Sequence, residues 1–453
     1  MKLRLLTLVA CMGICNAHAQ DSLQMRKIAD EILLHGTCYD NLRVLCKSVG
    51  HRISGSPAAA KAVSWGEKAM KEAGADKVWL QAADVPYWYR GKESLYLKMG
   101  KEYKKVRALS LGNSQGTSGR PLEAQVVMVH NFDEFKALPD SKVKGKIIFF
   151  DYRFRQDFVF TFHGYGDAVK YRWASPSVAA KKGAAGVIIR SMSTGMDDFP
   201  HTGGMHYNDS FLKIPEMALG NITADQLEQA CEKGEVMARM NSECHMMPAL
   251  VHSYNVIGEI KGTETPERII TVGGHLDSWD VGEGASDDGA GCVQSIEVIR
   301  AFKALGVKPK CTIRAVLFMN EENGNKGGEA YADSAKARSE HHILAVESDA
   351  GGFSPRGIGM EMPTEMKQRI LKYKNLFLDY GVYDFSLEEG GTDISPLKKK
   401  LDVPLVGLIP DSQRYFDLHH TDNDVFEQVN HRELKLGAAV MAQLIYLVSE
   451  NGL

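Results

Sequence analysis

Seven polar side chains in the second half of the chain have the types and spacing that metal chemistry requires. Each lies in a short glycine-rich or acidic segment, and they are His275, Asp277, Asp287, Glu321, Glu322, Asp349 and His420. Neighbouring carboxylates repel each other unless a positive charge lies between them. So many acids in irregular segments therefore predict bound cations, and the nearby glycines let the backbone turn tightly around them.

The types of these side chains indicate which metal they would hold. Imidazole and carboxylate ligands without thiolates suit zinc, and two histidines with three carboxylates suffice for two ions about 3.5 to 4 Å apart that share one carboxylate. In the pair His275 and Asp277, the imidazole is the predicted ligand and the carboxylate its orienting partner. Of the adjacent Glu321 and Glu322, one is expected to bind metal while the other handles protons. The sequence thus predicts a site for two zinc ions.

These residues lie beyond the ends of apolar segments that we predict to be strands. The segments are 269–272, 312–318, 343–347 and 403–409, and predicted helices over 290–305, 364–380 and 433–448 alternate with them. Apolar strands without strict alternation, separated by helices, are typical of an α/β fold with a mostly parallel mixed sheet and helices on both faces. Because ligands gather at the carboxyl ends of strands in such sheets, we expect the seven side chains to converge.

The first half of the chain divides into two parts of different character. Residues 20–87 contain a helix that begins after Ser56 and stops at Gly74, followed by a strand over 77–80. Residues 88–250 carry short strands punctuated by glycine and proline. In that part we predict strands over 143–152, 184–190 and 214–220 and a helix over 175–184. The change predicts a small α/β module inserted into a larger domain, which resumes over 251–453.

Composition narrows the class of protein and its location. A chain of 453 residues can bury a substantial core, and a net charge of −3 offers no broad basic surface, so we expect no nucleic-acid partner. Residues 1–19 combine a basic start, a short apolar stretch and a small-residue end, which predicts an export signal cleaved after Ala19. Attachment of lipid to Cys11 is the competing interpretation. No later segment has the roughly 18 uninterrupted apolar residues of a membrane span, so we expect a periplasmic or extracellular protein.

Six cysteines remain after the predicted signal. In an exported protein the close pairs Cys38/Cys46 and Cys231/Cys244 are candidate disulfides, although spacing alone proves neither bond. Cys292 and Cys311 lie in apolar helix and strand patterns and are expected to be buried thiols. None of the six has the paired close spacing of a zinc–thiolate site, so the metal prediction depends on the histidines and acids.

Six motifs in series make the chain resemble a known family. GGHLDS, ASDDGAG, NEENG, ESDAGG, GGTDISPL and HHTDND occur in the order and approximate spacing of the co-catalytic zinc exopeptidases. This family includes bacterial aminopeptidases and glutamate carboxypeptidase, and the chain is most similar to its carboxypeptidase Q branch. The resemblance covers nearly the whole mature chain, because residues 88–250 look like the protease-associated domain that this group carries as an insertion. It also implies a homodimer.

The resemblance implies a role for each site residue. One zinc would be held by His275 and Asp349 and the other by Glu322 and His420, with Asp287 as the bridge and a cis peptide bond to Asp288. Glu321 would be the general base, and Asp277 would support His275.

The final histidine is ambiguous, because His419 and His420 are adjacent. His420 is preferred, since the family places its ligand before a threonine or serine that is followed by an acid, here Thr421 and Asp424.

The resemblance also implies the substrates, which would be small peptides and particularly dipeptides with free ends. Aminopeptidase activity is the alternative within the same family. Two other classes share the architecture: noncatalytic binding proteins, which should lack some of the ligands, and cyclases that close an amino-terminal glutamine with one zinc. Zinc stoichiometry distinguishes the cyclase from the peptidase.

Overall fold

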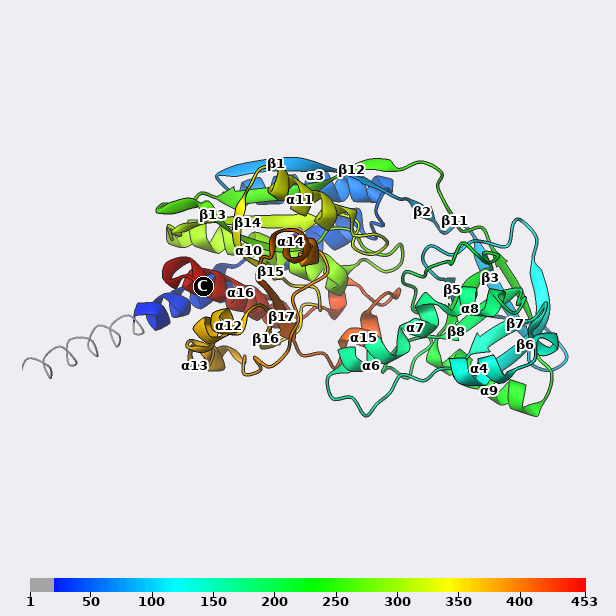
Figure 1. The fold of residues 1–453 in the computed structure, drawn as a ribbon. Helices are drawn as coiled ribbons and strands as arrows, with labels where there is room; N and C mark the ends of the chain where they lie inside the picture. Colours follow the sequence, from blue (N-terminus) through cyan, green and yellow to red (C-terminus); the bar gives the residue numbers. More distant parts are fainter. Residues whose placement is uncertain (1–19) are drawn as a thin grey trace, which may run out of the picture.

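A computed structural model describes residues 20–453, so the predicted export signal and Cys11 lie outside the described residues. Figure 1 shows two lobes, each built on its own sheet. None of the helices in the described range combines the length and hydropathy that a membrane crossing needs.

The larger lobe is built on a seven-stranded mixed sheet. In spatial order its strands are β1 (Lys77–Val85), β12 (Val251–Ile260), β14 (Cys311–Phe318), β13 (Thr265–His275), β15 (His341–Glu347), β17 (Leu405–Pro410) and β16 (Pro355–Glu361). The four strands from β14 to β17 pair in parallel, and the pairs at both edges are antiparallel.

The predicted mixed sheet is confirmed, but it contains more antiparallel pairing than expected, because β12 and β16 were not predicted as strands. Pro355, Gly357 and Gly359 are poor strand formers, so the sequence of β16 resembles a loop. β12 lies at the start of the predicted main domain, directly after the predicted module, and no strand was predicted there. Both strands pair antiparallel to their neighbours, which leaves parallel pairing to the centre of the sheet.

Helices cover both faces of this sheet, as the sequence predicts. In β14, Ile313 and Leu317 pack into a core on one face, while Val316 and Phe318 pack into a separate core on the other. The first face is covered by a helix over residues 20–35 and by α2 (Cys38–Val44), α3 (Pro57–Glu72), α10 (Ala290–Leu305), α12 (Thr364–Leu371) and α16 (His431–Asn451). The second is covered by α11 (Lys326–Ala337) and α14 (Ser395–Leu401).

Two helix boundaries follow from local capping. The Ser56 side chain accepts a hydrogen bond from the Ala59 N–H at 3.1 Å, and Pro57 occupies the first turn of α3. The Asn430 side chain caps α16 in the same way, through the N–H groups of Arg432 and Glu433. The helix predicted over 364–380 is instead broken. It consists of α12, α13 (Lys374–Phe377) and a 3-10 turn over Leu378–Tyr380. This stretch buries few side chains that could hold one straight helix against the core.

The smaller lobe contains an eight-stranded sheet. Its strands in spatial order are β4 (Lys104–Val106), β3 (Glu93–Lys98), β10 (Met237–Ser242), β6 (Leu122–Val129), β7 (Ile147–Phe150), β8 (Gly186–Arg190), β9 (Glu216–Leu219) and β5 (Ala108–Ser110). Its helices are α4 (Phe132–Ala137), α5 (Asp140–Val143), α6 (Thr161–Ala168), α7 (Lys170–Trp173), α8 (Ser175–Ala180) and α9 (Asn221–Lys233). Separate apolar cores lie on its two faces.

Two short strands join the lobes. β2 (Trp88–Tyr89) and β11 (His245–Met246) pair antiparallel where the chain leaves the larger lobe and returns to it. Arg90, next to β2, donates to both carboxylate oxygens of Asp280 at 2.8 and 2.6 Å, which adds a bidentate ion pair between the lobes. A third contact packs Phe154 and Met192 of the smaller lobe against Phe416 in α15 (Tyr415–Leu418).

The two candidate disulfides are absent, because all six cysteines among residues 20–453 are free thiols. Cys38 starts α2, and Cys46 lies eight residues further along continuous helical backbone, a rise of about 12 Å. A disulfide requires Cα atoms less than about 7 Å apart. Cys231 lies on α9 and packs against a core in the smaller lobe, whereas Cys244 packs beside Trp88 in a different cluster. Cys292 and Cys311 are buried, as predicted.

Candidate metal centre

The seven predicted side chains come together at the carboxyl ends of the central strands. β13 ends at His275 itself, Glu321 lies three residues beyond the end of β14, and Asp349 lies two residues beyond β15. His420 follows α15, which the chain reaches from the end of β17. Parallel neighbours end at the same edge of the sheet, so segments far apart in the sequence deliver their side chains to one place.

Asp287 divides its two carboxylate oxygens between two histidines. Its Oδ1 lies 3.2 Å from Nε2 of His275, which is also 3.3 Å from Oδ1 of Asp349. Its Oδ2 lies 3.1 Å from Nε2 of His420, which is also 3.1 Å from Oε2 of Glu322. The result is two adjacent clusters of nitrogen and oxygen donors with one carboxylate in common.

The loop that carries Asp287 is held from both sides. The Asp424 carboxylate accepts hydrogen bonds from the backbone N–H groups of Ser286 and Asp287 at 2.7 and 3.1 Å. The next residue, Asp288, accepts from the backbone N–H of His275 at 3.0 Å, and the peptide bond between Asp287 and Asp288 is cis. These contacts aim both oxygens of Asp287 at the two histidines.

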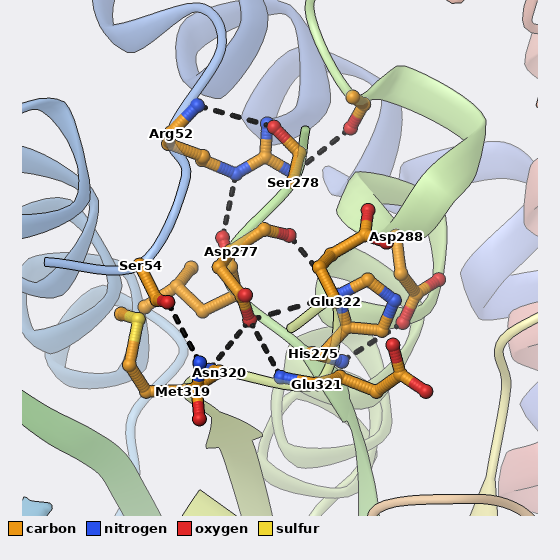
Figure 2. A network of polar contacts seen from close by, with 12 residues as sticks. Arg52, Ser54, His275, Asp277, Ser278, Asp288, Met319, Asn320, Glu321 and Glu322 are labelled. Carbon is orange, nitrogen blue, oxygen red and sulfur yellow. Dashed lines mark hydrogen bonds and ion pairs between the residues drawn. The ribbon is translucent and has the colours of Figure 1, made fainter. Parts of the chain in front are cut away.

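Asp277 supports the site mainly through backbone groups. Its Oδ1 accepts hydrogen bonds from the N–H groups of Asn320 and Glu321 at 2.7 and 3.1 Å, so it holds the turn that presents Glu321 and Glu322 (Figure 2). Nδ1 of His275 lies 3.0 Å from the backbone carbonyl of Asp277 and 3.8 Å from its carboxylate. The orienting contact to His275 therefore comes from the carbonyl oxygen of Asp277.

Burial and the crowding of acids shift the pKa values of the site. Burial raises the pKa of Glu321 well above its ordinary value, and Asp349 and Glu322 add to the shift against the opposing charge of His275. Burial and then the charge of Asp287 raise the pKa of Glu322 to about 7. Burial lowers the pKa of His420, but Glu322 and Asp287 outweigh it and raise the value to about 9. Carboxylates that favour a proton on this imidazole equally favour a metal cation at the same nitrogen.

His420 is better placed than His419 to be the second histidine ligand. Nε2 of His419 lies 3.7 Å from Asp287, compared with 3.1 Å for His420, and the two rings stack with their centroids 3.4 Å apart. Nδ1 of His420 donates to the backbone carbonyl of Thr202 at 3.4 Å, which turns Nε2 toward Asp287. Thr202 belongs to the smaller lobe, so both lobes build the site.

The residues present fit divalent cations. The donor atoms of His275, Asp287 and Asp349 all lie within 4.8 Å of one another, as do those of Asp287, His419 and His420. Oδ2 of Asp287 and Oδ1 of Asp349 are buried and accept no hydrogen bond. A buried carboxylate oxygen without a partner is costly unless a cation satisfies it. The set contains imidazole and carboxylate donors only, which is the chemistry of a zinc site.

A cavity of about 660 Å³ opens onto these side chains. The smaller lobe contributes Arg172 to its wall, and the side chain of Arg172 is only 6% exposed. Arg172 donates from Nε to the Gly204 carbonyl at 3.1 Å and from Nη2 to the Tyr165 hydroxyl at 2.6 Å, while Nη1 has no hydrogen-bond partner. A Cβ placed on Gly203 would lie 2.5 Å from that Nη1 and 2.6 Å from Nδ1 of His420. Gly203 therefore leaves room for the guanidinium beside the imidazole ring of His420.

Comparison with known proteins assigns the family. The sequence profile of peptidase family M28 matches residues 255–445. Carboxypeptidase Q of Homo sapiens is 32% identical over 413 residues, which cover 91% of this chain and 85% of that protein. Carboxypeptidase Q of Xenopus laevis is also 32% identical, covering 99% of this chain and 98% of the relative. The chain belongs to peptidase family M28.

Solved structures of M28 peptidases agree with this assignment. A peptidase M28 precursor from Shewanella amazonensis is 31% identical and superposes with a TM-score of 0.89, covering 95% of this chain and 97% of that one. A zinc aminopeptidase from Bacillus subtilis is 20% identical and shares the fold with a TM-score of 0.66, covering 90% and 94%. As a member of family M28 the chain is a metallo-exopeptidase.

Several residues that shape this M28 site were not assigned a structural role from the sequence. Asp288 and Asp424 stand inside the quoted motifs, so their positions beside Asp287 and His420 were the available signal. Arg52 donates to the carbonyl groups of Leu276, Glu283 and Gly284, which holds the loop before Asp287. Arg172 and Thr202 lie in another lobe, and no local pattern marks them.

Proposed function

We propose that this M28 peptidase holds two zinc ions and hydrolyses small peptides, above all unblocked dipeptides. The observation that carries the proposal is the arrangement around Asp287, whose two oxygens face two separate histidines at 3.2 and 3.1 Å. A carboxylate with one oxygen directed to each ion suits a pair of ions about 3.5 to 4 Å apart. One zinc is assigned to His275 and Asp349, and the other to Glu322 and His420.

Glu321 is the proposed general base and acid. When bound, the zinc ions polarise the peptide carbonyl and allow water to ionise near neutral pH. Glu321 takes the proton of the attacking water and delivers it to the leaving amine, a role worth about 10² to 10⁴ in rate. Asp277 fixes the backbone of Glu321 for this task.

Arg172 supports the choice of substrates with a free carboxyl terminus. Its guanidinium lines the cavity, and no carboxylate lies within ion-pair distance of it among the described residues. A buried arginine with a free N–H group is a suitable partner for a carboxylate, which accepts paired hydrogen bonds from the guanidinium plane. The carboxyl terminus of a dipeptide lies one residue beyond the scissile bond, so it is within reach of a group beside the metal centre.

Aminopeptidase activity is the second candidate. The carboxyl groups of Glu347 and Glu389 line the same cavity, and either could pair with a free amino terminus. An aminopeptidase would need that pairing but not the guanidinium of Arg172.

Four substrates with one amino-terminal residue in common decide between these functions: an unmodified dipeptide, its amino-blocked form, its carboxyl-terminal amide and an aminoacyl nitroanilide. A dipeptidase cleaves the unmodified dipeptide fastest and loses activity when the carboxylate is removed. Rapid cleavage of the nitroanilide alone would establish the aminopeptidase instead. Metal analysis of the same sample is expected to give two zinc ions per chain, and a single zinc would contradict the proposed centre.

We further propose that residues 88–250 form a protease-associated insertion domain and that residues 20–87 and 251–453 form the peptidase domain. The separate sheet and cores of the smaller lobe support this division. We also propose that the enzyme is exported and forms a homodimer. Fractionation of cells that express the full chain tests export, and light scattering of the purified protein tests the dimer.

A further inference from the structure

An aromatic segment of the smaller lobe forms one wall of the cavity beside the metal centre. We call residues 158–165 the aromatic arm; three of its rings line the cavity, those of Phe160, Phe162 and Tyr165. Phe160 and Phe162 stack with their centroids 5.3 Å apart, and both side chains are half-buried. Large apolar rings that remain partly open beside a catalytic centre are surface that a ligand can cover.

The aromatic arm is fixed to the opposite lobe. Thr161 donates its N–H to the Ser412 hydroxyl at 3.2 Å and its own hydroxyl to the Ser412 carbonyl at 2.7 Å. Gln413 donates its side-chain amide to the carbonyl of Val159 at 2.6 Å. These three bonds cross from one lobe to the other, so the position of the rings relative to the metal centre is set by both lobes.

The rings of the arm continue into the larger lobe. Phe162 stacks on Tyr415 with a centroid separation of 5.1 Å and meets Phe416 edge-on at 4.9 Å. Tyr165 also stacks on Phe416, with a centroid separation of 4.9 Å, and its hydroxyl accepts the hydrogen bond from Arg172. Ring contacts therefore connect Tyr165, beside the Arg172 guanidinium, to Phe162 through the buried ring of Phe416, and Tyr165 and Phe162 both line the cavity.

The position of Arg172 beside Tyr165 determines which part of a substrate the aromatic arm would contact. If the terminal carboxylate of a dipeptide pairs with Arg172, the side chain of that same residue branches from the adjacent carbon atom. From there it enters the cavity that Tyr165, Phe160 and Phe162 line together with Arg172. A large apolar side chain gains by covering these rings, because the burial removes apolar area from water on both partners. Glycine or alanine leaves the rings exposed.

We propose that Phe160 and Phe162 form the subsite for a large apolar side chain on the carboxyl-terminal residue of the substrate dipeptide. The proposal rests on the proposed function and deepens it by naming a substrate class. Phe160 and Phe162 determine specificity, since they touch the side chain and not the reacting atoms. Their contribution should appear as a difference between substrates and not as a general loss of rate.

The test measures kcat/KM for two series of dipeptides. In one, the carboxyl-terminal residue of Ala-Xaa varies through glycine, leucine and phenylalanine, and in the mirror series the amino-terminal residue varies. The wild-type enzyme is expected to cleave Ala-Phe and Ala-Leu at least about ten-fold faster than Ala-Gly. Phe162→Ala should reduce kcat/KM much more for Ala-Phe and Ala-Leu than for Ala-Gly, which removes most of that preference, and Phe162→Leu should keep much of it.

Phe158→Ala is the matched control, because Phe158 belongs to the same arm and packs against Arg155 and His163 but does not line the cavity. It should retain the wild-type preference. Zinc content and the unfolding midpoint, measured on every variant, report whether each one folds.

Five outcomes overturn the proposal. An equal loss on all substrates in Phe162→Ala would mean that the arm only supports the metal centre, and a preference that follows the amino-terminal residue would place the subsite on the other side of the scissile bond. Loss of the preference in Phe158→Ala as well would mean that the fold of the arm, and not the two rings, is responsible. Dipeptide cleavage by the wild type without regard to side chain would refute the subsite and leave the proposed function intact. Cleavage of no dipeptide at all would refute the proposed function and the subsite together.

Discussion

Asp287 is the residue on which the geometry of the metal centre depends most, since each of its oxygens faces a different histidine. Its neighbours are carboxylates from other strand ends, buried where water cannot screen their repulsion. At this scale, five side chains are the proposed zinc ligands, and one carboxylate among them is common to both ions. The carboxyl group of Glu321 lies beside them and binds no metal in our assignment.

Glu321→Gln separates proton transfer from metal binding. The amide has nearly the same shape but cannot accept the proton of water, so kcat should fall about 10²- to 10⁴-fold on any dipeptide that the wild type cleaves. Zinc content and thermal stability should stay near the wild-type values, because Glu321 is not a proposed ligand. The measurement is a turnover assay with metal analysis on the same sample. Undiminished turnover would remove Glu321 from the mechanism.

Alanine substitution of each adjacent histidine resolves which one is the ligand. His420→Ala removes the nitrogen that lies 3.1 Å from both Asp287 and Glu322, so the variant should hold about one zinc fewer per chain. His419→Ala, the matched control, should keep the full complement. Stoichiometry after dialysis is the measurement. The reverse pattern would assign the ligand to His419.

Arg172→Leu tests whether the guanidinium recognises a carboxylate. The variant should lose about ten- to hundred-fold in kcat/KM on an unmodified dipeptide, because a charge-assisted pair is worth about 1.5 to 3 kcal/mol. The carboxyl-terminal amide of the same peptide should be cleaved at the wild-type rate. Arg172→Lys should recover part of the loss, since it restores the charge without the planar fork. Equal losses on acid and amide would indicate a role in folding or at the scissile carbonyl.

At the scale of elements, the strands of the larger sheet deliver the ligands and neighbouring strands hold one another in register. Buried polar side chains assist in this. Arg314 on β14 donates to Glu340 at 2.8 Å, and His342 at the start of β15 lies 3.1 Å from the same carboxylate oxygen. Together they tie the end of α11 to two central strands.

This group gives stability a defined pH dependence. Burial opposes ionisation of Glu340, but the hydrogen bonds from His342 and Arg314 outweigh it and lower the pKa to about 2. A carboxylate whose pKa is lower in the folded state stabilises the protein above its unfolded pKa of about 4.5 and loses that contribution as the pH falls toward 2. Glu340→Gln should therefore reduce the free energy of unfolding by up to about 3 kcal/mol at pH 7, and by less at pH 4. Urea unfolding at both pH values measures the difference, and an equal loss at the two values would contradict the assignment.

On the scale of the whole molecule, the active site belongs to both lobes. Thr202, Arg172 and the aromatic arm come from the smaller lobe, whereas every proposed zinc ligand comes from the larger one. Ion pairs, hydrogen bonds and aromatic packing join the two around the cavity. Substitutions that change how the two lobes pack against each other should therefore alter substrate preference as well as stability.

Removal of zinc should destabilise the entire protein. Without cations the buried carboxylates of the centre repel one another, and the folded state loses the free energy of metal binding. The unfolding midpoint should fall after dialysis against a chelator and recover when zinc is restored. Glu321→Gln should respond in the same way, since its metal ligands are intact. A midpoint that does not depend on zinc would exclude a structural contribution from the centre.

Local chemistry was sufficient to predict which side chains meet at one edge of the sheet. Histidine and carboxylate motifs after apolar strands carry that information in a few consecutive residues, because the strand and its following turn are set locally. The central strands and α10 were predicted for the same reason, since continuous apolar runs are buried wherever the chain folds. Helices with few buried side chains and strands rich in glycine, such as α12 and β16, were predicted poorly.

Other features depend on contacts between residues far apart in the sequence, and only the folded structure shows them. The spacing of Cys38 and Cys46 suggested a disulfide, but the helical path between them holds the thiols apart. Whether Arg172 faces the metal centre depends on how two lobes pack, and no window of sequence around it contains that packing. The local sequence determines which residues have the side chains that the reaction needs. Long-range contacts determine which of these residues meet, because those contacts form only when the complete chain buries its core.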